Sequence, residues 1–195
     1  MKLAKLASAL LLLSASTIAF SSDWSIDNSH SELHFISVKK GSIAEVHQFK
    51  KLSGTLDSKG DFELSIDLAS VDTMNPVRDA RMTKFLFETT KFSNATLSAK
   101  LDPAELDAIA EGADKRLSID AKLNLHGVTK TVPLDIIVTR LVGARFSAVS
   151  ATPIILNVGD FALTEGVDKL RELASLPSIS YAVPVTFHLT LKLNK

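Results

Sequence analysis

The five histidines are the first residues to consider, because imidazole serves both as a metal ligand and as a general base. His30 and His34 would lie on the same side of an extended strand, about 13 Å apart at about 3.3 Å per residue. The ligands of one metal ion each lie about 2 Å from it, so this pair cannot share an ion. His47 falls on a neighbouring segment and His188 on the polar side of the last predicted strand. The spacing predicts solvated or turn-stabilising histidines and no metal site.

The sequence does not indicate a catalytic nucleophile or a pair of catalytic carboxylates either. The chain has no cysteine, which excludes a thiol nucleophile, a disulfide and a thiolate metal site. Serines are numerous, but no G-x-S-x-G motif occurs. The acidic residues alternate outward along predicted strands, as solvated faces do. We therefore expect a protein that is not an enzyme and has no cofactor; a small hydrolase or metal enzyme is an alternative supported only by the scattered histidines.

The run Arg78-Asp79-Ala80-Arg81 is a charged segment with two possible interpretations. It predicts a solvated helix face with an internal ion pair. Alternatively, Arg78 or Arg81 meets an anionic head group at the mouth of a barrel, since guanidinium binds phosphate and carboxylate well. The sequence leaves both interpretations open.

The apolar residues that would position these groups follow a period of two. In residues 117–138, Leu117, Ile119, Ala121, Leu123 and Leu125 alternate with polar residues, and Val132, Leu134, Ile136 and Val138 repeat the pattern after a His126-Gly127 turn. This alternation is typical of an antiparallel hairpin with one face in an apolar interior and the other in water.

About eight segments of the chain show the same two-faced pattern. Strands are predicted at 24–27, 32–39, 61–68, 94–101, 117–125, 132–138, 144–157 and 182–193, and short helices at 77–87, 103–110 and 166–176. Residues 46–56 are predicted to form a strand pair or one bent strand with a possible bulge at Gly54, and Pro153 indicates a bend or an edge in the strand at 144–157. Parallel strands would read as continuous apolar runs. The chain is therefore predicted to be all-β, an antiparallel eight-stranded barrel with one to three short helices.

The interior of such a barrel is either packed or wide enough for one slender ligand. Alanines among the inward leucines leave room for an apolar guest, or for phenylalanines from a neighbouring segment. The residues predicted to line a cavity are Leu64, Ile66, Leu97, Leu123, Leu125, Phe146, Phe187 and Leu189, with Phe85 and Phe87 near an opening and Arg78 and Arg81 as head-group candidates. Alternation alone does not decide between cavity and packed core.

The first residues predict export. Two lysines, an apolar run and small residues at Ala19-Phe20-Ser21 are typical of a secretory signal peptide over 1–21, leaving a domain of 22–195. The product would be periplasmic, or extracellular where there is no outer membrane. The basic and acidic residues balance at 22 each, and no basic block predicts a nucleic-acid partner. No second apolar run predicts a stable membrane anchor, and the chain is expected to be a monomer or a homodimer.

Three motifs add a resemblance to a known family. The segments W-S-I-D-N-S-H-S at 24–31, S-V-D-T at 70–73 and L-N-L-H-G-V-T-K at 123–130 occur in the order found in the YceI-like, lipid/polyisoprenoid-binding family. The resemblance implies a lipocalin-like barrel whose apolar cavity holds a long isoprenoid chain, in an exported bacterial protein without catalytic activity. Near the end, Asp160-Phe161-Ala162 stands where the family usually has aspartate–phenylalanine–glycine.

Two functions follow as hypotheses. The first is a carrier that binds an isoprenoid or similar long-chain amphiphile by burial, since each CH₂ removed from water contributes about 0.8 kcal/mol before ordering costs. The second is a packed-core structural or stress-related interaction protein of the periplasm without a ligand. A co-purifying lipid would discriminate between them.

Overall fold

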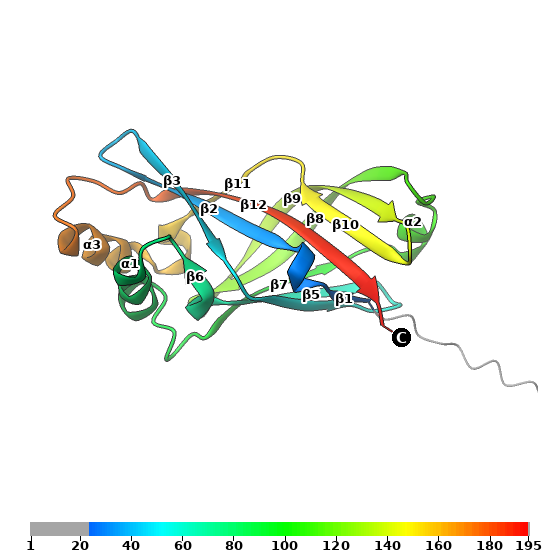
Figure 1. The fold of residues 1–195 in the computed structure, drawn as a ribbon, viewed down its shortest axis with the longest axis horizontal. Helices are drawn as coiled ribbons and strands as arrows, with labels where there is room; N and C mark the ends of the chain where they lie inside the picture. The colour runs from blue at the N-terminus through cyan, green and yellow to red at the C-terminus, as the bar shows by residue number, and fades with distance from the viewer. Residues whose placement is uncertain (1–23, 195) are drawn as a thin grey trace, which may run out of the picture.

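A computed structural model describes residues 24–194, which form an elongated barrel with short helices at its two ends (Figure 1). Helices α1 (Pro76–Arg81) and α3 (Thr164–Leu173) cover one end, and α2 (Pro103–Asp107) lies at the other. The predicted signal peptide lies outside the described residues.

The barrel is built from antiparallel strands that close on themselves. The strands are β1 (Trp24–Ile26), β2 (Glu32–Lys39), β3 (Ile43–Phe49), β4 (Leu52–Leu56), β5 (Asp61–Asp67), β6 (Val71–Asp72), β7 (Asn94–Lys100), β8 (Asp114–Leu125), β9 (Val128–Leu141), β10 (Arg145–Ser150), β11 (Ile154–Asn157) and β12 (Ala182–Leu193). Closure occurs because β1 pairs with both β4 and β12. If β1 and β2, β3 and β4, and β10 and β11 are counted as interrupted strands, and the two-residue β6 is left aside, the predicted eight-stranded barrel is confirmed.

The central hairpin forms as the alternation predicts. Strands β8 and β9 pair continuously from Asp114 and Thr139 to Leu125 and Val128. His126 (φ 53°) and Gly127 (φ 78°) both adopt the left-handed conformation, which suits a two-residue turn between twisted strands. Leu117, Ala121 and Leu123 are buried on the inner side.

The tip of this hairpin is packed against residues 88–92. The His126 ring lies 4.4 Å from that of Phe92, and its Nε2 atom lies 3.0 Å from Glu88 Oε2. A Cβ atom at Gly127 would lie 2.9 Å from Phe92 Cε1. Two of the residues that carry the family resemblance, His126 and Gly127, thus hold a turn in place at the barrel surface.

Helix boundaries follow local capping. The Asn75 side chain accepts hydrogen bonds from the backbone N–H groups of Val77 and Arg78, and Pro76 begins α1, which continues as a π-helical turn, Met82–Leu86. The helix predicted at 103–110 is shorter, and the one predicted at 166–176 begins at Thr164 and ends at Leu173.

The strand predicted at 144–157 is divided near Pro153. Its first part, β10, pairs with β9 and β12, whereas the second part, β11, pairs with β12 alone among the strands of residues 24–194. Proline has no N–H group to give to a ladder, so the break falls where the sequence suggests a bend or an edge.

Candidate functional site

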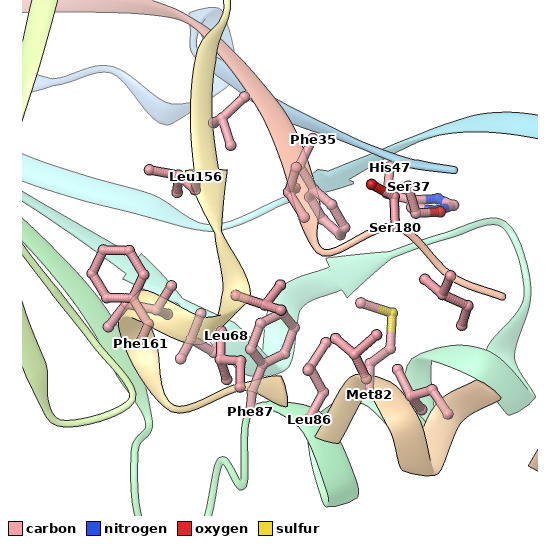
Figure 2. Close-up of a pocket in the computed structure, with 18 of the residues that line it drawn as sticks. Phe35, Ser37, His47, Leu68, Met82, Leu86, Phe87, Leu156, Phe161 and Ser180 are labelled. Carbon is pink, nitrogen blue, oxygen red and sulfur yellow. The ribbon is translucent and has the colours of Figure 1, made fainter. Parts of the chain in front are cut away.

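A cavity of about 440 Å³ occupies the half of the barrel that is covered by α1 and α3. This volume is within the range of small-molecule binding sites, roughly 300–1,000 Å³. Figure 2 shows Phe35, Ser37 and His47 on one side of the cavity and Met82, Leu86 and Phe87 on the other. Apolar side chains from the inner faces of β2, β3, β5, β7, β8, β11 and β12 complete the wall. The cavity is thus a space between the sheet and the helices that close its end.

The opposite half of the barrel is packed. Only about 60 Å³ remains there, enclosed by leucines, isoleucines and phenylalanines that include Leu56, Phe62, Leu101, Leu134 and Leu191. The two alternatives for the interior are therefore both realised: the barrel is hollow toward α1 and α3 and filled toward α2.

The residues predicted to line a cavity are divided between these two halves. The larger cavity is lined by Ile66, Phe87, Leu123 and Leu125, and also by the two head-group candidates Arg78 and Arg81. The remaining inward residues surround the small residual space, namely Leu64, Leu97, Phe146, Phe187 and Leu189. Phe85 lines neither space; it is half-buried, with Lys84 Nζ 5.0 Å from the centre of its ring.

Several residues that line the cavity come from segments whose sequence does not indicate a place at a binding site. Phe161 and Leu163 follow β11, Val167 and Leu170 lie on α3, and Ile179 precedes β12. The alternation of a strand identifies an inner face, but it does not show which helix lies over the open end. The i, i+3 spacing of Val167 and Leu170 was the available signal.

Polar and charged side chains gather at the end of the cavity where its lining is most exposed. Asn75, Val77 and Ala174 are exposed lining residues, so they mark the mouth. Arg78 donates from Nε to Thr73 Oγ1 (2.8 Å), from one terminal nitrogen to Glu45 Oε2 (2.9 Å) and from the other to the Thr73 carbonyl (2.6 Å). Arg78 therefore pairs with Glu45 across the fold, and the carboxylate of the neighbouring Asp79 accepts from Thr73 instead.

Glu45 and Arg81 complete the charged end. Lys39 Nζ lies 2.7 Å from Glu45 Oε2, and this hydrogen bond, with the nearby charge of Arg78, holds the pKa of Glu45 below its usual value. Arg81 donates to the carbonyl of Leu173 at the end of α3 (3.2 Å) and forms no ion pair with a carboxylate in residues 24–194. Of the two head-group candidates, Arg81 is therefore the one whose charge is not paired with a carboxylate in residues 24–194.

His47 corrects the expectation of solvated or turn-stabilising histidines. Its side chain is 3% exposed and packs with its ring 5.2 Å from that of Phe35. Nε2 lies 2.9 Å from Ser37 Oγ, and Nδ1 has no hydrogen-bond partner within the described residues. Burial, reinforced by the positive charge of Arg78, lowers the pKa of His47. The cavity wall thus holds a neutral imidazole.

This burial predicts a pH dependence of stability. The folded protein keeps His47 neutral, whereas the unfolded chain takes up a proton below the ordinary histidine pKa of about 6.5. The free energy of unfolding should therefore fall as the pH is lowered from 6.5, by at most about 1.4 kcal/mol per pH unit from this group. Urea denaturation between pH 5 and 8 measures the slope. His47→Gln should flatten it, and His188→Gln, at an exposed histidine, should not; equal slopes in all three proteins would contradict the assignment.

The helices over the cavity are held together at Gly166 of α3. A Cβ atom there would lie 2.8 Å from the Phe85 carbonyl oxygen and 2.9 Å from Leu86 Cα. Gly166→Leu is expected to push α3 away from the Met82–Leu86 turn, with a loss of about 2–3 kcal/mol in unfolding free energy. Hydrogen exchange of the α3 amides should accelerate. Glu165→Leu, at the exposed neighbouring position, should leave both measurements near wild type; an effect as large as that of Gly166→Leu would refute the role of this contact.

Two further observations concern the described part of the chain. No group of three or more histidine, aspartate or glutamate side chains in residues 24–194 is arranged to hold a metal ion. None of the helices described there combines the length and the apolar character needed to cross a membrane.

The comparisons with known proteins agree with this fold. The model of a family described as the YceI-like domain matches residues 24–191. A polyisoprenoid binding domain from Saccharophagus degradans, implicated in plant cell wall breakdown, is 38% identical, with a TM-score of 0.86 over 88% of this chain and 98% of that chain. No curated protein matches.

Two more distant structures share the fold. BcnA of Burkholderia cenocepacia is 18% identical, with a TM-score of 0.62 over 85% of this chain and 98% of that chain. The YCEI protein of Campylobacter jejuni is 16% identical, with a TM-score of 0.52 over 76% of this chain and 84% of that chain.

Proposed function

The chain belongs to the YceI-like family, and on that premise we propose that it is an exported, non-catalytic binding protein that holds an isoprenoid or similar long-chain amphiphile in the cavity beneath α1 and α3. The observation that carries the proposal is the cavity of about 440 Å³ in a barrel whose other half is packed. Protein interiors seldom leave such a volume unfilled, because the side chains around it lose their contacts.

The lining explains how an amphiphile would be oriented. Phe35, Phe49 and Leu68 lie deep in the cavity, and a hydrocarbon tail placed against them is removed from water at about 0.8 kcal/mol per CH₂ group. Lys39, Arg78 and Arg81 lie with the exposed lining residues at the mouth. The tail therefore enters first, and the head group stays among the cations. The relative from Saccharophagus degradans, described as a polyisoprenoid binding domain, supports the same class of ligand.

Chain length provides the first test. Protein stripped of lipid by organic extraction is titrated with polyprenols of increasing length. Affinity should rise with each added isoprene unit until the cavity is full and then level off, because further units remain in water. Affinity that does not depend on length, or no binding of any polyprenol, would contradict the proposal.

Export belongs to the same proposal and has a separate test. The lysines, the apolar run and the Ala19-Phe20-Ser21 sequence support cleavage of a signal peptide. Expression in a Gram-negative host, followed by fractionation and mass measurement, should give a periplasmic chain that begins at Ser22. An intact Met1 chain in the cytoplasm would refute export.

A further inference from the structure

The exposed apolar side chains of the barrel are concentrated around the mouth of the cavity. Seven large apolar residues are exposed in residues 24–194: Ile43, Val46, Met74, Val77, Val142, Ile155 and Tyr181. All but Val142 lie on β3, β11, α1 or the segments that precede α1 and β12, in the half of the barrel that contains the cavity. Val142 lies in the turn between β9 and β10, at the packed end. The exposed apolar side chains are therefore distributed unequally between the two ends of the barrel.

Four of these residues come from two elements that touch at the mouth. We call them the apolar rim: Ile43 and Val46 on β3, and Met74 and Val77 at the start of α1. The ion pair of Arg78 with Glu45 joins the two elements, and Val77 itself lines the cavity. Figure 1 shows the β2–β3 hairpin and α1 at the same end of the molecule.

Met74 is the rim residue whose exposure is least explained by the requirements of folding. Its side chain is 87% exposed, and its backbone has a φ of 60°. The left-handed region is uncommon for residues other than glycine, with asparagine and aspartate the most frequent exceptions. Neither burial nor backbone preference therefore accounts for a methionine at this position.

The apolar character continues onto the outer face of the sheet. The neighbours of Val46 in the chain, Glu45 and His47, line the cavity, so Val46 points away from the barrel. Its cross-strand partner on β2 is Ile36, and Ile155 of β11 is paired with Pro184 of β12 in the same outward orientation. Exposed apolar side chains thus occur on the outer face as well as at the mouth, and an exposed apolar patch marks an interaction site.

The carboxylates nearest the apolar rim are already paired or hydrogen-bonded. Glu45 is paired with Lys39 and Arg78, and Asp79 accepts hydrogen bonds from Thr73. Lys40 at the tip of the β2–β3 hairpin, like Arg81, has no carboxylate partner within residues 24–194, so both can meet phosphate groups. Apolar side chains next to free cations fit the boundary between lipid head groups and acyl chains.

We propose that the apolar rim docks the mouth of the cavity on a phospholipid bilayer, from which the ligand enters or to which it is returned. The inference rests on the proposed function in one respect: a long-chain amphiphile dissolves in membranes and not in water, so its transfer requires the mouth to reach the lipid. The cations Lys40 and Arg81, which lie at the same end as the apolar rim and are unpaired within the described residues, favour a bilayer with anionic head groups as the occupant.

The test is co-flotation of the purified protein with phosphatidylcholine vesicles and with mixed phosphatidylcholine–phosphatidylglycerol vesicles. Wild type should float with both and bind the mixed vesicles more strongly. The double variant Met74→Asn/Val77→Ser should bind about tenfold more weakly, because two apolar side chains no longer leave water. Ile43→Thr/Val46→Thr, which keeps β-branched residues on β3, should show a similar loss. Thermal unfolding verifies that both variants are folded.

Val142→Ser is the matched control, since Val142 is 67% exposed and Val77 60%. It should float as wild type does. A wild type that floats with neither vesicle, or a Val142→Ser variant that loses as much binding as the rim variants, would overturn the proposal. A wild type that is a stable dimer and becomes a monomer in the rim variants would also overturn it, because the face would then be a subunit interface.

The outcomes separate this inference from the proposed function. If the rim docks on lipid but the cavity holds none, wild type floats and takes up no polyprenol. If the cavity holds lipid but the rim does not dock, wild type binds polyprenol and does not float.

Discussion

Replacing Ala95 with tryptophan is expected to abolish lipid binding while the barrel remains folded. Ala95 is buried on β7, opposite Ile66 of β5, and its side chain faces the larger cavity. An indole at this position occupies space that the ligand needs. Excluding about four CH₂ groups at about 0.8 kcal/mol each corresponds to a Kd roughly 200-fold higher. Displacement of a fluorescent fatty-acid probe by polyprenol measures the change.

Ser98 provides the control on the same strand. Its side chain is exposed on the outer face of β7, so Ser98→Trp adds the same group outside the barrel and should leave the Kd within about twofold of wild type. Circular dichroism and thermal unfolding establish that both variants are folded. A folded Ala95→Trp protein that binds polyprenol as tightly as wild type would show that the ligand site lies elsewhere.

Replacing Gly54 with valine is expected to cause the largest loss of stability. Gly54 lies on β4 opposite Leu64 of β5, where a Cβ atom would clash with the carbonyl oxygen of Glu63 and lie 2.8 Å from Ile26 Cδ1. The Glu63 backbone and the packed Ile26 side chain leave the structure around a valine at this position little room to relax. The free energy of unfolding should fall by about 3–4 kcal/mol. Urea denaturation with two spectroscopic probes measures the loss.

The neighbouring Ser53 is exposed, so Ser53→Val introduces the same side chain on the outer face of β4. Valine suits a strand, and the variant should be within about 0.5 kcal/mol of wild type. If Gly54→Val were as stable as Ser53→Val, the close approach of β4 and β5 would have no energetic consequence.

Strand alternation predicted the barrel correctly because each strand has one side in an apolar interior and one in water. The β8–β9 hairpin, with its turn at His126 and Gly127, lies where the period of two and the turn residues indicate. The role of Gly54 could not be predicted from the sequence. The sequence suggested a bulge, whereas the residue permits a close approach of two strands, which only the three-dimensional arrangement reveals.

The position of the cavity could not be predicted in the same way. One face of β12 carries Val183, Val185, Phe187, Leu189 and Leu191. Val183 and Val185 line the large cavity, whereas the other three line the packed half. Which half stays hollow depends on the residues that cover its end. Helix α3, which the sequence predicts at 166–176 without any sign of a role at the cavity, supplies Val167 and Leu170 to that cover.

The ion pair of Arg78 is a second feature that could not be predicted from the sequence. Its neighbour in the sequence, Asp79, suggested a local ion pair, but Glu45 of β3 is the partner. The pairing of β3 with β6, the short strand just before α1, brings α1 to β3, and the chain on either side of Arg78 gives no sign of this partner. Likewise, the burial of His47 depends on Phe35 and on the helices across the cavity, and a lone histidine in a short strand does not signal it.

Native mass spectrometry of the protein as purified from cells tests the central claim most directly. We expect a population heavier than the bare polypeptide by the mass of one long-chain amphiphile, released on collisional activation and missing from Ala95→Trp. A wild-type protein that carries no such mass, and that gains none after incubation with polyprenol, would contradict the account.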